Sequence, residues 1–181
     1  MFKEVGVFQN IDRNNWGGSP ASPKPLGPAL ALVGFVGLCL LAGGAGAALS
    51  SRSVESWYDA LNKPPLTPPK EVFGPVWGAL YVMIGVAGWM VWRRCGGSRP
   101  LRLWGWQLAL NAAWAPVFFR LRSPLLALAV LITLVGVVLQ TIRSFWSVHR
   151  PAALLMAPYA AWTIFALYLN AGFAWMNPFQ D

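Results

Sequence analysis

The stretch VESWYDALNKPPLTPPKEVFGPVWGALY, residues 54–81, is the only long polar segment between apolar runs in this chain. It carries Trp57 and Tyr58 ahead of four prolines, whose fixed φ angle and missing N–H are incompatible with the interior of a helix or sheet. An apolar run follows, and Pro75 suits the first turn of a helix because that position needs no donor. Connectors of this length are usually lids or binding loops. We therefore expect residues 50–74 to form a stiffened cover over a ligand held among helices.

The composition of the 181-residue chain indicates a membrane protein. Hydrophobic residues make up 56% and charged residues 11%, whereas soluble domains carry roughly a quarter charged residues. The formal charge is +8, but the basic residues stand between apolar runs, where they anchor helices to headgroups. No nucleic-acid partner is therefore expected. Cys39 and Cys95 lack metal-ligand spacing and the chain has one histidine, so we expect no metal site.

Five apolar runs predict an all-α fold, an integral membrane bundle of five transmembrane helices, since a span needs roughly 20 apolar residues. The runs cover about residues 29–49, 75–92, 103–119, 125–142 and 151–176. Residues 1–28 are polar and rich in proline and glycine, so we expect a disordered tail before a membrane domain at 29–177. Most basic residues fall on the side of this tail, which favours a cytoplasmic N-terminus and places the proline-rich loop on the other side.

The third span places polar and aromatic side chains on one face of a helix. Gln107, Asn111, Trp114 and Phe118 recur at helical spacing. A buried amide without a partner costs about a few kcal/mol, so both amides need partners. Two interpretations stay open: the amides hold helices together, or they form a pocket wall that offers hydrogen bonds to a ligand.

Another side of the third span carries a ridge of small residues, Gly105, Ala109 and Ala113. In lipid such a ridge predicts either a dimer contact or tight packing within one chain. None of the spans contains an acidic residue. Ion-coupled pumps usually need carboxylates within the membrane, so a pump is not expected.

Two further spans carry aromatic stripes at helical spacing. They comprise Trp77 and Tyr81 on the second span, and Tyr159, Trp162, Ala166 and Asn170 on the fifth. Such stripes are more often packing or interface belts than binding sites. Three helices with aromatic side chains beside amides, below a stiffened loop, nevertheless suit a flat hydrophobic ligand such as a tetrapyrrole, a sterol or a polycyclic drug.

Several segments, taken in their order along the chain, resemble the TspO family. They are WYDALNKP at 57–64 followed by Pro68 and Pro69, VWGALY at 76–81, QLALNAAWAPVFF at 107–119, and PYAAW with a later LN within 158–170. This family comprises the translocator proteins, or peripheral-type benzodiazepine receptors, and the bacterial tryptophan-rich sensory proteins. The resemblance covers about residues 30–177 and leaves the N-terminal tail outside.

The resemblance implies a five-helix bundle, commonly a homodimer, that binds porphyrins such as protoporphyrin IX or haem and needs no obligatory cofactor. In some members it also implies binding of sterols and synthetic drugs. It favours a multi-pass protein of a bacterial membrane, or of the mitochondrial outer membrane in a eukaryote. The positions that match the family pocket are Tyr58, Pro64, Asn111, Trp114, Tyr159, Trp162 and Ala166.

The candidate ligand-binding residues combine both lines of reasoning. They are Trp57, Tyr58, Asn62, Pro64, Leu66, Trp77, Tyr81, Gln107, Asn111, Trp114, Phe118, Tyr159, Trp162, Ala166 and Asn170. Leu66 stands where many members have a tryptophan linked to light-dependent porphyrin breakdown, so we assign no catalytic residue. Tyr168 is not followed by the basic residue of the sterol pattern, which gives sterol recognition by that route no support.

We therefore expect a membrane-embedded binding and sensing protein for tetrapyrroles, which influences porphyrin handling or stress signalling. Its partners would be the lipid bilayer, the porphyrin and a second copy of the chain. The alternatives are a transporter of porphyrin or sterol across the membrane, and a light-dependent enzyme that degrades porphyrin.

Overall fold

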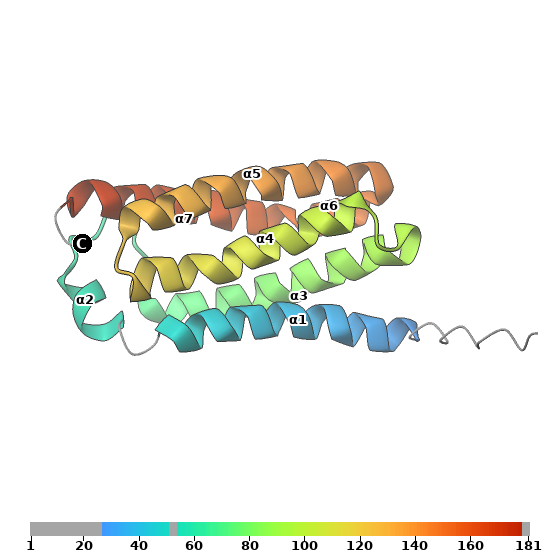
Figure 1. Ribbon diagram of the computed structural model, residues 1–181, viewed down its shortest axis with the longest axis horizontal. Helices are drawn as coiled ribbons and strands as arrows, with labels where there is room; N and C mark the ends of the chain where they lie inside the picture. The colour runs from blue at the N-terminus through green and yellow to red at the C-terminus, as the bar shows by residue number, and fades with distance from the viewer. Residues whose placement is uncertain (1–26, 51–53, 179–181) are drawn as a thin grey trace, which may run out of the picture.

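The computed structural model describes residues 27–50 and 54–178, and this part of the chain is helical without strands. Five rods run side by side along the longest axis (Figure 1). They are built from α1 (Pro28–Ser50), α3 (Lys70–Cys95), α4 (Arg99–Ala115), α5 (Pro124–Val148) and α7 (Ala157–Met176). The short helix α2 (Val54–Ala60) lies at one end of the bundle (Figure 1). The prediction of an all-α bundle is confirmed, whereas the tail predicted for residues 1–28 lies outside the described residues apart from its last two positions.

Most rods have the length and composition of membrane spans. Within the described residues, four segments qualify: Pro28–Gly46, Lys70–Cys95, Pro124–Val148 and Arg150–Met176. The remaining rod is α4, whose 17 residues continue as a π-helix, η1 (Pro116–Arg120). The chain is thus an integral, multi-pass membrane protein, as its composition predicts.

Two prolines explain the irregular turns in these rods. A proline within a helix cannot donate to the carbonyl four residues earlier, so the ladder must adjust there. After Pro116 the turn widens, and Leu121 N donates to the Pro116 carbonyl at 3.0 Å. Pro158 likewise has no N–H to donate to the preceding turn. The rod formed by α6 (Arg150–Leu155) and α7 is accordingly interrupted at Met156. π turns are frequent at functional sites, and η1 borders the cavity described below.

The second span begins earlier than the sequence predicts. Helix α3 starts at Lys70, so Pro75 lies inside the helix and not in its first turn. Tertiary contacts hold the additional turn: Lys70 pairs with Asp59 at 2.7 Å, and the ring of Phe73 lies 5.9 Å from that of Trp162. The cover predicted for residues 50–74 is therefore shorter, because it ends at Pro69 before α3 begins. It contains α2.

Close packing joins α1 to α3. A Cβ added at Gly85 would lie 2.7 Å from the backbone Cα of Val36, so glycine is what allows this approach. Helix α1 also contacts α4, and α5 contacts both α4 and α7. Ile84 and Tyr159 are completely buried at the centre, whereas Leu41 is 72% exposed on the outside of α1, where lipid would meet it.

Candidate functional site

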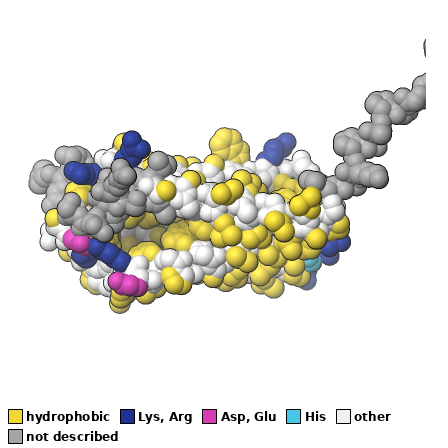
Figure 2. All heavy atoms as spheres, turned by 90° about the horizontal axis from the view of Figure 1, so that it is seen from below, with side chains coloured by type: hydrophobic (Ala, Val, Ile, Leu, Met, Phe, Trp, Pro, Cys, Tyr) yellow, Lys and Arg dark blue, Asp and Glu magenta, His cyan; other side chains and the backbone are white. Residues whose placement is uncertain are grey.

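A cavity of about 470 Å³ opens between α1, α3 and α4 near the end where α2 lies. Small-molecule sites typically have volumes of about 300–1,000 Å³. Leu40 of α1, Trp77 of α3 and Trp114 of α4 contribute to its walls, and Tyr58 of α2 closes it on the loop side. Figure 2 shows this hollow, with hydrophobic side chains inside it and both acidic and basic side chains close by.

One wall of the cavity depends on a glycine. A Cβ at Gly43 would overlap ring atoms of Tyr81, so the absence of a side chain lets this ring lie against α1. Tyr81 in turn stacks on Trp77, with 5.4 Å between ring centres and 28° between ring planes. The ring of Trp162 meets Trp77 edge-on at 6.5 Å. Trp162 therefore forms a second layer behind Trp77 and does not border the cavity itself.

Asn111 links three helices beside the cavity. The Tyr81 hydroxyl donates to Asn111 Oδ1 at 2.6 Å, and Asn111 Nδ2 donates to the Tyr159 hydroxyl at 3.1 Å. Tyr159 is completely buried, whereas Tyr81 and Asn111 both border the cavity. An amide carries two N–H groups and two oxygen lone pairs, so Asn111 retains one of each for a ligand. Asn111 thus holds helices together and also forms part of the pocket wall.

The other two buried amides differ from Asn111. Asn170 Oδ1 accepts from Trp114 Nε1 at 3.0 Å, and Asn170 Nδ2 donates to the Pro124 carbonyl at 2.7 Å, so Asn170 connects α4, α5 and α7. Gln107 is fully buried, and neither its oxygen nor its nitrogen has a hydrogen-bond partner among the described residues. It does not border the cavity.

A smaller space of about 50 Å³ adjoins the cavity, because Tyr58 and Trp114 line both. Phe118, Ala166 and Asn170 line only the smaller space. Phe118 stacks on Trp114, with 5.6 Å between ring centres. This aromatic partition places three predicted site residues one layer away from the larger cavity.

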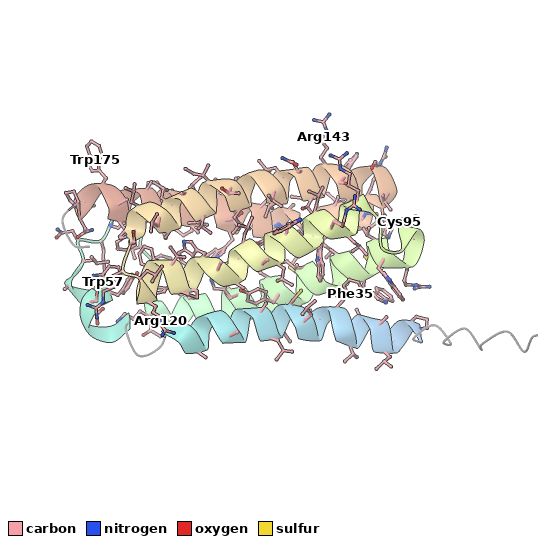
Figure 3. All side chains as sticks on the ribbon, viewed as in Figure 1. Phe35, Trp57, Cys95, Arg120, Arg143 and Trp175 are labelled. Carbon is pink, nitrogen blue, oxygen red and sulfur yellow. The ribbon has the colours of Figure 1, made fainter. Side chains whose placement is uncertain are left out.

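The proline-rich cover is fastened to the end of α7. Asn62 N donates to Asn177 Oδ1 at 2.9 Å, and Asn177 Nδ2 donates to the Asn62 carbonyl at 3.1 Å. Pro64 packs on Gly172, where an added Cβ would lie 2.6 Å from the proline ring. Trp57 lies at the same end of the bundle (Figure 3), with its ring 5.7 Å from that of Phe118. The cover is thus held by specific contacts as well as by its prolines.

Charged groups stand where the cover meets α3. Lys70 Nζ, which borders the cavity, donates to Asp59 Oδ2 at 2.8 Å, and Lys63 Nζ lies 3.6 Å from Asp59 Oδ1. The hydrogen bond from Lys70 and the charges of both lysines hold the pKa of Asp59 below its usual range. Both ammonium groups lie over the ring of Tyr58, at 5.4 and 5.7 Å. Burial, and then the charge of Asp59, raise the pKa of Tyr58, so its hydroxyl stays neutral.

Leu66 lies on the outer side of the cover. Its side chain is 78% exposed, and its φ of 65° is in the left-handed region that L residues rarely adopt. The hydroxyl of Thr67 supports this turn by donating to the Pro64 carbonyl at 2.7 Å. Leu66 does not border the cavity.

The sequence-based candidates therefore fall into two groups. Those that border the cavity are Tyr58, Trp77, Tyr81, Asn111 and Trp114. Those that lie behind its walls or on the cover are Trp57, Asn62, Pro64, Leu66, Gln107, Phe118, Tyr159, Trp162, Ala166 and Asn170.

Several residues that line the cavity are absent from the candidates. They include Leu40, Gly43, Lys70, Phe73 and Phe119. The contribution of α1 has no signal in the sequence, because its glycines and leucines look the same whether they face lipid or a cavity. Lys70 does carry a signal, since a basic residue after the Pro-Pro pair is common in the resembled family.

Comparison with known proteins places the chain in one family. The model of the TspO/MBR family matches residues 35–176. A translocator protein from Bos taurus is 40% identical over 148 residues, which cover 79% of this chain and 88% of the relative. The tryptophan-rich protein TspO from Chlorobaculum tepidum is 36% identical over 153 residues, which cover 82% and 97%. Its counterpart from Archaeoglobus fulgidus is 37% identical over 150 residues, with the same two coverages. With the resemblance in the sequence confirmed in this way, the chain belongs to the TspO/MBR family.

Proposed function

We propose that this chain is a membrane-embedded binding and sensing protein for a tetrapyrrole such as protoporphyrin IX or haem. The observation that carries the proposal is the cavity of about 470 Å³, which combines aromatic walls with one anchored amide and one ammonium group. Flat, mostly apolar ligands suit sites that contain a small number of well-placed polar groups.

The positions of the polar groups fit a ligand with an acidic edge. Lys70 and Lys63 carry positive charge at the loop side of the cavity, and Asp59 neutralises only one of these charges. The carboxylates of a porphyrin would pair with these ammonium groups, while the macrocycle lies between Trp77 and Trp114 and one edge meets Asn111. Because the cover is already fastened to α7, its ordering would add little to the entropic cost of binding.

The test is a titration of the detergent-purified protein with protoporphyrin IX, followed by quenching of tryptophan fluorescence. We expect saturable binding in the micromolar range, on the order of −8 kcal/mol. Asn111→Ala removes the proposed hydrogen bond to the ligand, worth about 1 kcal/mol, so the Kd for protoporphyrin IX should rise roughly fivefold. Trp106→Phe is the matched control, because Trp106 lies on α4 but is 66% exposed.

Two results would overturn the proposal. One is the absence of saturable binding to a protein whose helical content is intact. The other is an equal loss of affinity in Asn111→Ala and in Trp106→Phe, because a general effect on α4 would then explain both.

An exposed ridge of small residues on α4 supports a homodimer as the assembly. The ridge of Gly105, Ala109 and Ala113 is exposed along α4, and nothing lies within 4 Å of a Cβ added at Gly105. Small residues allow two helices to approach closely in lipid. Ala109→Leu should therefore reduce cross-linking between copies in vesicles, whereas Ala129→Leu on the exposed side of α5 should not.

Transport across the membrane is the second candidate, since four relatives at 40–42% identity are named translocator proteins. The lining residues of the cavity belong to the half of the bundle near α2, which favours binding over passage. Porphyrin flux into liposomes that contain the purified protein would decide for transport. Degradation of porphyrin under illumination would instead indicate an enzyme.

A further inference from the structure

A second hollow, of about 260 Å³, lies at the end of the bundle opposite α2. Its lining consists of Trp89, Met90, Arg93 and Arg94 from the last turns of α3, and of His149 from the joint between α5 and α6. Figure 2 shows the histidine beside basic side chains at this end, far from the acidic ones. The proposed tetrapyrrole site uses none of these residues.

Two contacts fix the shape of this basic hollow. Trp89 Nε1 donates to the Pro28 carbonyl at 2.9 Å, which anchors the indole ring against the start of α1. The guanidinium carbon of Arg93 lies 5.0 Å from the centre of this ring. A guanidinium stacked on an aromatic face keeps its N–H edges available for an anion. Trp89 thus holds Arg93 in place without neutralising it.

His149, at the junction of α5 and α6, lines the same hollow from outside α3. Burial, followed by the positive charge of Arg94, lowers the pKa of His149, so its imidazole is neutral at pH 7 and offers one N–H donor. The negative end of the α3 dipole alone would attract arginines to the last turn. That attraction does not account for a hollow or for a histidine from another rod.

The positive charge of the basic hollow is not balanced within the described part of the chain. Both ion pairs found there belong to Asp59, at the opposite end. Further arginines increase the positive potential: Arg99, Arg102, Arg143 and Arg150 lie at the ends of α4, α5 and α6 on the same side. Figure 3 shows Arg143 and Cys95 at this end, and Trp57 and Arg120 at the other. A concentration of one charge sign attracts counter-ions of the other.

The position of the hollow near the membrane–water boundary favours a lipid as its ligand. Trp89 and Trp92 stand near the end of α3, where tryptophans commonly mark the membrane–water boundary. Met90 and Trp89 supply an apolar wall beside the two arginines. The distribution of basic residues predicts that this end is cytoplasmic, and anionic lipids are enriched in the cytoplasmic leaflet.

We propose that the basic hollow binds the phosphate headgroup of an anionic phospholipid. Arg93 and Arg94 pair with the phosphate oxygens, and the His149 N–H donates a hydrogen bond to the headgroup. The acyl chains extend from the apolar wall into the bilayer.

The experiment uses the full-length chain after delipidation, with bound lipid counted by native mass spectrometry. Phosphatidylglycerol and phosphatidylcholine are added at equal concentrations. In a second assay, phosphatidylglycerol and inorganic phosphate are each tested alone by their effect on thermal unfolding. Arg93→Gln with Arg94→Gln removes two charges from the hollow, whereas Arg99→Gln with Arg102→Gln removes two charges from the same end outside it. Arg94→Gln alone serves if the double variant does not fold.

We expect the wild type to retain phosphatidylglycerol in preference to phosphatidylcholine. Each basic residue near an anionic surface contributes roughly a fivefold factor to affinity, so the Arg93/Arg94 variant should lose on the order of 25-fold and Arg94→Gln about fivefold. The Arg99/Arg102 variant lowers the positive potential at this end but leaves the hollow intact, so it should lose less affinity and keep the preference for phosphatidylglycerol. Equal losses in both double variants, or no preference in the wild type, would overturn the site. Stabilisation by inorganic phosphate alone as strong as that by the lipid would show that the ligand is a soluble anion.

Discussion

The hydrogen bonds of Asn111 allow a quantitative test of what holds the bundle together. Replacement of Asn111 by leucine keeps most of the side-chain volume but leaves the hydroxyls of Tyr81 and Tyr159 without their amide partner. The two hydroxyls are not equivalent. Tyr81 borders the cavity, where water or a ligand can replace the amide, whereas Tyr159 is completely buried.

This difference sets the expected magnitude. A buried group left without a hydrogen bond costs about 1–3 kcal/mol, which applies to Tyr159. Side-chain couplings in membrane proteins average about 0.6 kcal/mol, which is the better guide for Tyr81. We therefore expect Asn111→Leu to lower the free energy of unfolding by about 2–3 kcal/mol, most of it through Tyr159.

The assay is reversible unfolding in mixed micelles for Asn111→Leu, Tyr159→Phe and the double variant. Because both substitutions break the same hydrogen bond, the double variant should be destabilised by about 1–2 kcal/mol less than the sum of the two. Tyr81→Phe combined with Asn111→Leu should show a coupling near 0.6 kcal/mol. A coupling below about 0.5 kcal/mol for the Tyr159 pair would refute the argument, since independent sites are additive to that level.

Three further predictions concern packing and the cover. Gly85→Ala should cost about 1–3 kcal/mol of unfolding free energy, because the added Cβ meets backbone of α1, whereas Gly136→Ala in open space should be neutral or stabilising by up to about 1 kcal/mol. Asn177→Ala removes two hydrogen bonds to the cover and should speed hydrogen exchange at Asn62 roughly tenfold or more. Since the pKa of Asp59 is lower when folded than when unfolded, its pairing with Lys70 should persist above the usual carboxyl pKa of about 3.9 and be lost as the pH falls through the lowered value. The rate of amide hydrogen exchange in the cover, corrected for the intrinsic rate at each pH, should rise only where Asp59 becomes protonated.

Each of these predictions has a result that would contradict it. Equal costs for the two glycine substitutions would mean that α1 does not rest on Gly85. Unchanged exchange at Asn62 in Asn177→Ala would show that prolines alone order the cover. An acid-induced rise that persists in Asp59→Asn would assign the effect to another group.

The helices were predictable because their signals are local. Apolar runs, flanking arginines and prolines lie within single segments, and they determined the all-α class and the order of the rods. The predicted start of the second span at Pro75 was wrong, because α3 begins five residues earlier, at Lys70. The contacts that extend α3 to Lys70 come from Asp59 and Trp162, which lie outside the segment itself.

The candidate site was only partly predictable. Helical spacing placed Gln107, Asn111 and Trp114 on one face. Asn111 and Trp114 border the cavity, whereas Gln107 does not. Helical spacing shows which side chains share a face of a helix. It does not show which of them reach a cavity, nor which neighbouring helix the face contacts. Trp162 shows the same limit, since its ring lies behind Trp77 and not on the cavity wall.

The sequence by itself determined the membrane class, the helical rods and the family, because composition and motif order need no knowledge of neighbours. Only the tertiary structure decided that Asn111 meets Tyr81 and Tyr159, which are 30 and 48 residues away along the chain, and that α1 closes the cavity through Gly43. The physical reason is the solvent. In a bilayer the interior and the surroundings are both apolar, so hydrophobicity cannot distinguish a face that meets lipid from one that meets another helix or a ligand.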